Sequence, residues 1–343
     1  MIQTWRFGGE RLADWAGANA RGRHANRREC AYLWKMRYRH TPTVAATLAI
    51  TWLPLVGQTN PEASVTWEPD QPIQGSFVHL VVNPDVNGNP GEWDGRVGGF
   101  LADQPLHFER DRTGAFRALG AIPVSAAETI PLQITVDTGR DSSHHLIRIP
   151  VDPGNFRMER LSVSSRFSTA PDSALQERIR SESGRSAAVS RTAHDGPRMW
   201  HGEWVRPRPT RVTSPFGTGR VFNGEVRSRH LGVDLNGETG DPIRAGNRGI
   251  VALVGDFYYA GNVVYIQHGA GLVTIYMHMS EVLVEEGDVV ERGQLIGRVG
   301  ATGRVTGPHL HWMGRYGSVS VDPLTLFELD STAFPSPLPD LSR

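Results

Sequence analysis

The region from residue 210 to residue 328 repeats one local pattern, in which short apolar stretches are separated by glycine or aspartate. The clearest stretches are Gly249–Val254, Asn262–His268, Leu272–His278 and Val319–Val321. A period of two places alternate side chains on opposite faces of an extended strand, and frequent turn residues allow neighbouring strands to pair. The pattern therefore predicts an all-β domain over 210–328, in which any helix is short.

A second set of short strands is predicted over residues 64–155. Apolar stretches at Phe77–Val82, Pro131–Val136 and His145–Val151 are separated by clusters of Gly, Pro, Asn and Asp. Short strands with frequent turns are typical of a small β-sandwich. A chain of 343 residues is long enough for two folded regions. The predicted fold class is therefore mostly β, with a sandwich-like N-terminal domain and a β-rich C-terminal domain.

Residues 156–209 have the composition of a linker between these two regions. Ser173–Ser183 is predicted to form a short helix, and Ser, Arg, Pro and Gly dominate after it. The sequence RPRPT at Arg206–Thr210 favours an extended, semi-rigid backbone, because proline fixes φ and lacks an N–H donor. The C-terminal domain is therefore predicted to begin near Thr210, and residues 329–343 are predicted to form a tail.

Residues 1–60 are predicted to be a targeting segment rather than part of the fold. Arg37 and Arg39 precede the apolar run Val44–Val56, which polar residues follow. A basic stretch before an apolar run of this length is typical of a secretory signal, and the run is short for a membrane span. Met36 heads the segment and is a possible true start. We expect export to the periplasm, cell envelope or exterior, with at most transient membrane association.

The composition excludes several classes of function. Lys+Arg and Asp+Glu are equal at 36 each, so the net charge provides no attraction to nucleic acid, and no nucleic-acid partner is expected. Cys30 is the single cysteine, which excludes an internal disulfide framework and a cysteine-based zinc site. Lys35 is the single lysine, which excludes a lipoyl or biotinyl carrier in the C-terminal domain.

Five polar side chains of the C-terminal domain can converge on one metal ion. They are His230 and Asp234 in RHLGVDL, His278 in TIYMHM, and His309 and His311 in GPHLHW. Residues two or four apart on a strand project from the same face, so each pair can offer both side chains to one point. Imidazole nitrogens and one carboxylate oxygen are a usual ligand set for zinc.

The number of protein ligands separates a catalytic zinc site from a structural one. Three ligands leave a position for water, which zinc activates for attack on a carbonyl group, and the remaining histidines can transfer protons. A fourth ligand, from His278 or His309, would close the site and make it structural. The spacing does not decide which of His309 and His311 binds the metal.

Other histidines fit simpler interpretations. His144 and His145 are adjacent on a predicted strand and therefore point to opposite faces, which favours a solvated strand end over a metal site. His268 is interpreted as a structural residue that holds a turn. The Gly-rich run Gly300–Gly307 lacks the ending of a phosphate-binding loop, so its glycines are expected to allow a close approach beside the H-x-H strand.

Taken together and in order, the motifs of this region closely resemble the lysostaphin-type (LytM-type) zinc metallopeptidases. The resemblance covers about residues 210–328. The matching segments are Ser214–Gly217, Arg220, Phe222–Gly224, His230–Asp234, Tyr276–His278, Glu286–Gln294 and Gly303–His311.

The resemblance implies a cradle of antiparallel β-sheets with a groove floored by one Zn²⁺ per chain. By position, His230, Asp234 and His311 would be the metal ligands, and His278 and His309 would act as general base and general acid. The implied substrates are the stem or cross-link peptides of peptidoglycan. A tyrosine that some members place ahead of the first ligand is not obvious here, since Gly224 lies in that neighbourhood.

Two questions stay open at the level of sequence. A non-catalytic cell-wall-binding regulator that activates a separate amidase is an alternative to the endopeptidase, although all five site positions are intact. The scissile bond depends on the groove walls, for which the segments Asp256–Gly261 and Arg315–Ser318 are the predicted contributors. The sequence does not indicate an oligomeric state.

Overall fold

The computed structural model describes residues 63–84, 95–139, 141–164, 167, 171–224, 226–329 and 334. The predicted targeting segment, residues 1–60, and most of the predicted tail, residues 329–343, lie outside the described residues. Among the residues that are described, no helix is both long enough and apolar enough to cross a membrane.

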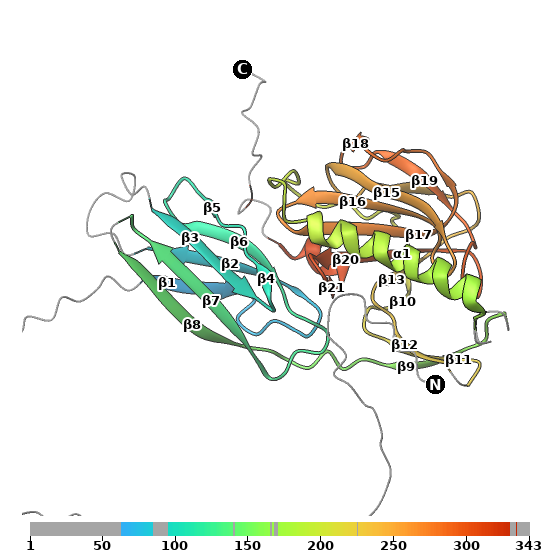
Figure 1. The fold of residues 1–343 in the computed structure, drawn as a ribbon, viewed down its shortest axis with the longest axis horizontal. Helices are drawn as coiled ribbons and strands as arrows, with labels where there is room; N and C mark the ends of the chain where they lie inside the picture. Colours follow the sequence, from blue (N-terminus) through green and yellow to red (C-terminus); the bar gives the residue numbers. More distant parts are fainter. Residues whose placement is uncertain are drawn as a thin grey trace, which may run out of the picture. The chain divides into compact units, whose positions relative to one another are not determined.

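Eight described strands form two sheets in the N-terminal region (Figure 1). Every second side chain of β7 (Thr129–Asp137), from Ile130 to Val136, is buried. The sheets have the orders β1-β2-β6-β5 and β4-β3-β7-β8, and their inner faces share one apolar core. The predicted strands overlap β2, β7 and β8. The other bounds are β1 (Ser64–Glu68), β2 (Phe77–Asn83), β3 (Arg96–Leu101), β4 (Gln104–Pro105), β5 (Glu109–Arg110), β6 (Phe116–Ala121) and β8 (Ser142–Pro150).

A ten-stranded antiparallel sheet carries the C-terminal region, which confirms the predicted fold class. Its main path is β10-β13-β20-β17-β16-β15-β18, while β14 pairs with β19, β19 with β17, and β21 with β20. The bounds are β10 (Val212–Ser214), β13 (Val233–Asn236), β14 (Pro242–Arg244), β15 (Gly249–Phe257), β16 (Gly261–Gly269), β17 (Leu272–Val282), β18 (Val289–Val290), β19 (Leu295–Val299), β20 (His309–Tyr316), β21 (Val319–Val321) and the short 3-10 helix η3 (Pro323–Phe327).

The predicted linker is not a free connection, because part of it adds a strand beside the C-terminal domain. Strand β9 (Met158–Leu161) pairs in parallel with β11 (Gly219–Phe222), which pairs in turn with β12 (Val226–Arg229). The resulting order is β12-β11-β9. Residues before the predicted boundary at Thr210 therefore help to build the surface around the C-terminal sheet.

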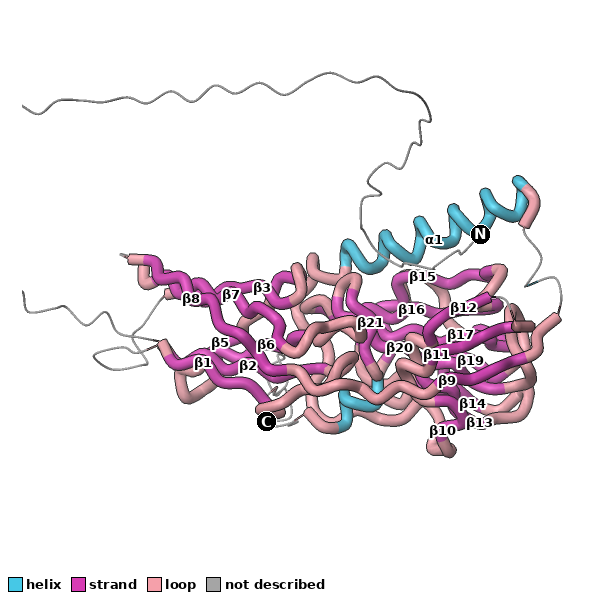
Figure 2. The backbone as a smooth tube through the Cα atoms, turned by 90° about the horizontal axis from the view of Figure 1, so that it is seen from below, coloured by secondary structure: helices cyan, strands magenta, loops and turns pink. Residues whose placement is uncertain are grey.

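The helix predicted at Ser173–Ser183 is longer than predicted, since α1 spans Ser173–Thr192, 20 residues. It begins at Asp172, whose side chain accepts a hydrogen bond from the backbone N–H of Leu175 at 2.8 Å. The helix lies along the sheet next to β15 (Figure 2).

The second half of α1 could not be predicted from the sequence, because its serines are typical of a linker. Ser186 and Ser190 are buried, and each accepts a hydrogen bond from Arg315 of β20, at 3.1 and 3.2 Å. Tyr265 also donates to Ser186 at 3.0 Å. Partners supplied from a distant part of the chain therefore stabilise a helical turn that its own composition does not favour.

The N-terminal and C-terminal regions share apolar contacts and belong to one compact unit. Phe77 and Leu119 of the N-terminal sheets belong to the same buried cluster as Trp200. Arg198 pairs with Glu109 through three hydrogen bonds, two from Nε at 2.9 and 3.0 Å and one from Nη2 at 2.7 Å. The two regions therefore share part of their apolar core.

His268 is a structural residue, in agreement with its interpretation from sequence. Its side chain is fully buried, and its two ring nitrogens contact the Arg248 carbonyl at 2.7 Å and the Thr274 hydroxyl at 2.8 Å. Because the carbonyl only accepts, Nδ1 carries the proton and Nε2 accepts from the hydroxyl. Burial lowers the pKa of His268 to about 4, although the bond to the carbonyl opposes this shift.

We expect the burial of His268 to make the free energy of unfolding decrease in acid. An unfolded histidine titrates near pH 6.5, so below that pH the unfolded chain binds a proton that the folded chain refuses until about pH 4. Stability from this residue is therefore complete above pH 6.5 and decreases as the pH falls, by about 3 kcal/mol in total. Urea unfolding should show that the stability advantage of wild type over His268→Gln shrinks between pH 7.5 and pH 4.5. An advantage that stays constant would contradict this prediction.

Candidate metal centre

Three predicted ligands, His230, Asp234 and His311, meet at one point and are all buried. His230 Nε2 lies 2.9 Å from Asp234 Oδ1 and 2.9 Å from His311 Nδ1, and the latter two atoms are 2.8 Å apart. Antiparallel pairing of β13 with β20 places Asp234 directly opposite His311. The neighbouring residues Val233 and Leu310 point to the other face and are fully buried.

The structure corrects the reason given for the pairing of His230 with Asp234. The two residues do not share a strand, because β12 ends at Arg229 and β13 begins at Val233. His230 lies in the connection, where its backbone N–H donates to the Thr218 carbonyl at 2.8 Å. Tertiary contacts, rather than strand periodicity, therefore bring its imidazole to the carboxylate.

Outer hydrogen bonds orient two of the three ligands. His230 Nδ1 lies 2.9 Å from the Pro215 carbonyl, which can only accept, so the proton sits on Nδ1 and the lone pair of Nε2 faces the cluster. Arg220 Nη2 lies 2.5 Å from Asp234 Oδ2, which leaves Oδ1 for the cluster. Arg220 also donates to Ser214 at 2.9 Å, and Ser214 donates to Glu159 of β9 at 3.1 Å.

The electrostatics of the cluster favour a charged Asp234 carboxylate and a neutral His311 imidazole. Burial opposes ionisation of Asp234, but attraction to His230 and hydrogen bonds with His230 and His311 hold its pKa well below the usual range. Burial lowers the pKa of His311 to about 4, although Asp234 opposes this shift. A carboxylate with a neutral imidazole is the protonation state in which these groups bind a cation.

The remaining two site histidines, His278 and His309, lie beside the cluster with their rings 5.0 Å apart. His278 Nδ1 lies 2.9 Å from the Thr302 carbonyl and His309 Nδ1 lies 2.9 Å from the Gly307 carbonyl. Because carbonyls only accept, each Nδ1 carries a proton and each Nε2 is free to exchange one. His309 Nε2 approaches Asp234 Oδ1 at 3.5 Å.

The backbone at His278 departs from strand geometry. Its φ is 65°, which is uncommon for a residue other than glycine and costs free energy that the surroundings must supply. The departure breaks the alternation of β17, so the adjacent residues Met277 and His278 line the same cavity. Burial, followed by repulsion from His309 and His311, lowers the pKa of His278 well below the usual value, so its imidazole is neutral at pH 7.

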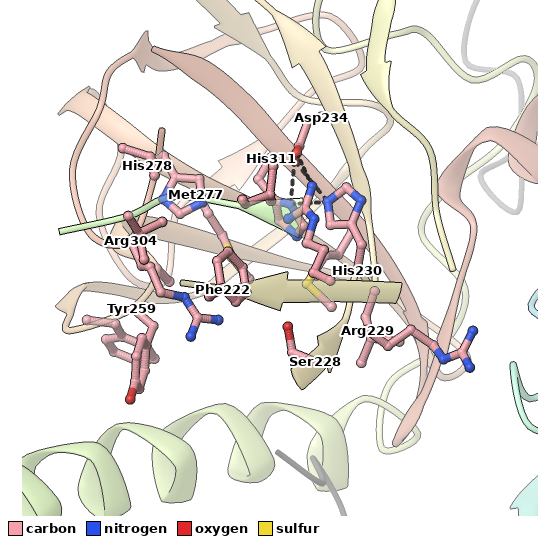
Figure 3. Close-up of a pocket in the computed structure, with 18 of the residues that line it drawn as sticks. Phe222, Ser228, Arg229, His230, Asp234, Tyr259, Met277, His278, Arg304 and His311 are labelled. Atoms are coloured by element: carbon pink, nitrogen blue, oxygen red, sulfur yellow. Dashed lines mark hydrogen bonds and ion pairs between the residues drawn. The ribbon is translucent and has the colours of Figure 1, made fainter. Parts of the chain in front are cut away.

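A cleft of about 520 Å³ opens beside the five residues (Figure 3). Strand β9 and helix α1 contribute apolar lining, including Met158, Leu161 and Ile179. Of the two segments predicted to form groove walls, residues 256–261 line the cleft through Phe257, Tyr259 and Ala260. The other segment, 315–318, does not line it, because Arg315 contacts α1 and Ser318 donates to Gln104 of β4.

Sequence reasoning missed several residues of the site. Arg220 and Arg304 fall within the motifs that carried the resemblance, yet no role was derived for either. Glu159 lies in the predicted linker and had no sequence signal, because its partners Ser214 and Arg220 are more than fifty residues away. Tyr259 and Arg304 both line the cleft, on the same side as His278 (Figure 3).

Comparison with known proteins places this geometry in a family. Residues 228–323 match the model described as Peptidase family M23. Over 103 residues the chain is 44% identical to the peptidoglycan DD-endopeptidase ShyA of Vibrio cholerae serotype O1, covering 30% of this chain and 24% of that protein. It is 31% identical to the catalytic domain of lysostaphin from Staphylococcus simulans, covering 93% of that chain and 35% of this one, with a TM-score of 0.32.

Residues 228–323 of this chain belong to peptidase family M23. The predicted lysostaphin-type family is thereby confirmed, and His230, Asp234 and His311 form the metal site expected of an M23 peptidase. A solved structure described as a putative peptidase M23 from Pseudomonas aeruginosa is also similar, with 25% identity and a TM-score of 0.57. The similarity covers 75% of this chain and 95% of that one, and so extends beyond the M23 region. By contrast, the match to ShyA spans about a quarter of that curated relative's length.

Proposed function

We propose that this protein is a zinc-dependent endopeptidase that hydrolyses peptide bonds in the stem or cross-link peptides of peptidoglycan. The observation that carries the proposal is the convergence of His230 Nε2, Asp234 Oδ1 and His311 Nδ1 beside a cleft. Two further histidines with free Nε2 atoms line the same cleft. The combination supports hydrolysis better than a purely structural metal site.

The donor set fits one zinc ion per chain. Two imidazole nitrogens and one carboxylate oxygen suit zinc, and among the described residues the cluster has three members rather than the four of a structural site. His230 Nδ1 carries a proton, so the lone pair of Nε2 points into the cluster. Arg220 occupies Asp234 Oδ2, so Oδ1 points into the cluster. When bound, zinc supplies Lewis-acid polarisation of the scissile carbonyl group and acidifies water.

The two remaining histidines divide the proton transfers. His278 is neutral at pH 7 and holds its Nδ1 proton against the Thr302 carbonyl, so its Nε2 accepts a proton from the attacking water. His309 takes up a proton from solvent on Nε2 and delivers it to the peptide nitrogen as the carbon–nitrogen bond breaks, and the proton that His278 accepted returns to solvent. Water thus supplies the oxygen of the new carboxylate, and the products are a carboxylate and an amine.

The substrate is inferred from the family and from the name of a relative. ShyA is named as a peptidoglycan DD-endopeptidase, and the region shared with it contains the metal site. Peptidoglycan lies outside the cytoplasmic membrane, so this function requires export. The predicted targeting segment, residues 1–60, would provide that route.

Digestion of purified peptidoglycan tests the proposal. Protein lacking residues 1–60 should release peptide fragments that mass spectrometry identifies, and both a chelator and the His309→Gln substitution should stop the release. Restoring zinc after chelation should restore cleavage. Stoichiometric zinc without any cleavage would overturn the endopeptidase and favour the regulator that activates a separate amidase.

A further inference from the structure

Three of the described arginines line the cleft, and two of them have polar partners. Arg220 pairs with Asp234, and Arg229 donates to the Gly217 carbonyl at 2.8 Å and lies over the Phe156 ring. Arg304 differs, because its guanidinium group has no hydrogen bond or ion pair with any residue in the described part of the chain. Among the described residues of the cleft, Arg304 is therefore an arginine whose N–H donors are not used by the fold.

Aromatic rings hold this guanidinium group in place. Its central carbon lies 4.3 Å from the centre of the Phe222 ring and 4.6 Å from that of the Tyr259 ring. The backbone N–H of Arg304 donates to the Tyr259 carbonyl at 2.8 Å. Aromatic contacts fix an arginine side chain without using its N–H donors, so the donors remain available to a ligand.

The position of Arg304 is tied to that of the reacting groups. Thr302, two residues earlier, accepts the Nδ1 proton of His278, and Figure 3 shows Arg304 on the same side of the cleft as His278. Gly303 between them has a φ of +75°, and a Cβ atom there would lie 2.4 Å from the Gly261 nitrogen. The segment of residues 302–304 is therefore packed tightly. It contains both the carbonyl group that holds His278 and the cationic side chain of Arg304.

The surroundings of Arg304 favour an anionic ligand. Burial lowers the pKa of Arg304, and repulsion from Arg220 adds to the effect, while Tyr259 opposes it. A partly buried cation beside another cation is costly until an anion binds it. A guanidinium group with free N–H donors matches a carboxylate, which accepts two parallel hydrogen bonds.

We propose that Arg304 binds a free carboxylate of the peptide, on the residue whose amino group the cleavage releases. This inference rests on the proposed endopeptidase function. Most backbone carboxyl groups of a peptide are consumed in amide bonds. A free carboxylate lies beside the scissile nitrogen in one case only. The carbon atom bonded to that nitrogen must also carry a carboxyl group that is not part of an amide bond. Arg304 thus selects cross-links in which the residue after the scissile bond carries a free α-carboxylate.

Two synthetic peptide dimers test this selection. They differ only in whether the α-carboxyl group beside the cross-link amine is a free acid or a carboxamide. Wild-type enzyme should cleave the acid with a kcat/KM about 10- to 100-fold above that of the amide, the range expected for a charge-assisted pair. Arg304→Gln should bring this ratio close to one, and Arg304→Lys should retain part of it. Arg298→Gln removes a cation from an exposed pair with Glu281 and should leave the ratio unchanged.

The ratio of two substrates does not depend on the fraction of a variant that is folded and active. A ratio that is the same in wild type and Arg304→Gln would overturn the role of Arg304 while leaving the endopeptidase intact. A wild-type ratio near one would also overturn the role of Arg304 without affecting the endopeptidase.

Binding provides a readout that does not need turnover. With cleavage blocked by His309→Gln, calorimetry should show that the acid dimer binds about 10-fold or more tightly than the amide, and that adding Arg304→Gln removes this difference. If wild-type enzyme cleaves neither dimer, a retained binding difference supports Arg304 and counts against the proposed catalysis. Equal binding of the acid and amide dimers would overturn the inference.

Discussion

Replacing His311 by alanine should abolish both zinc binding and peptidoglycan cleavage, whereas His309→Gln should retain zinc and lose turnover. His311 contributes one of three mutually contacting donor atoms, and two remaining ligands do not hold zinc tightly. His309 lies outside that group and is proposed to transfer a proton, a role that contributes about 10²- to 10⁴-fold to the rate. His230→Ala and Asp234→Ala should behave like His311→Ala, and His278→Ala like His309→Gln.

The measurement combines the zinc content of each purified variant with its rate of fragment release from peptidoglycan. His144→Ala is a suitable control, because His144 is an exposed residue of β8 whose ring contacts Thr135. It should keep both zinc and activity. Full activity of His311→Ala would refute its assignment as a ligand, and loss of zinc in His309→Gln would move His309 into the ligand set.

Gly232→Ala should destabilise the protein by about 2–3 kcal/mol and weaken metal binding, because the site has no room for a methyl group. A Cβ atom at Gly232 would lie 2.6 Å from the Trp312 carbonyl oxygen and 2.7 Å from His311 Nε2. Backbone atoms of β20 cannot move aside without shifting β13, the strand that carries Asp234. Urea unfolding and zinc titration measure the two effects.

Gly184→Ala is the matched control for this change. The substitution is chemically identical, but Gly184 lies on the exposed side of α1, where a Cβ atom would meet nothing within 4 Å. Alanine favours a helix over glycine, so this variant should gain about 0.5–1 kcal/mol and bind zinc normally. Equal behaviour of the two variants would show that the close approach at Gly232 does not constrain the metal site.

The Gly-rich run before the H-x-H strand was interpreted correctly from sequence at one glycine and not at another. The run was expected to allow a close approach, and a Cβ atom at Gly300 would indeed lie 2.4 Å from the Ser280 nitrogen and 2.7 Å from the His278 carbonyl oxygen. Gly307, in contrast, has open space. Gly300 also pairs with His309 at the start of β20, so the run lies beside the H-x-H strand as expected, while β17 provides the closest contacts.

By itself, the sequence determined the β-rich class, the positions of the longer C-terminal strands and the five polar residues of the site. These features are local: a period of two marks each strand, and short motifs such as H-L-H keep their chemistry wherever they fold. The division of His309 and His311 into proton donor and ligand came from the family resemblance. In the structure, it is His311 that lies opposite Asp234.

Only the tertiary structure decided features that depend on contacts between distant residues. The second half of α1 needs Arg315, which lies 129 residues beyond Ser186. The direction of the Asp234 carboxylate depends on Arg220, and the unoccupied donors of Arg304 become visible only when its described neighbours are known. Periodicity reports the face on which a side chain lies, whereas hydrogen-bond partners and close approaches depend on how the strands are brought together.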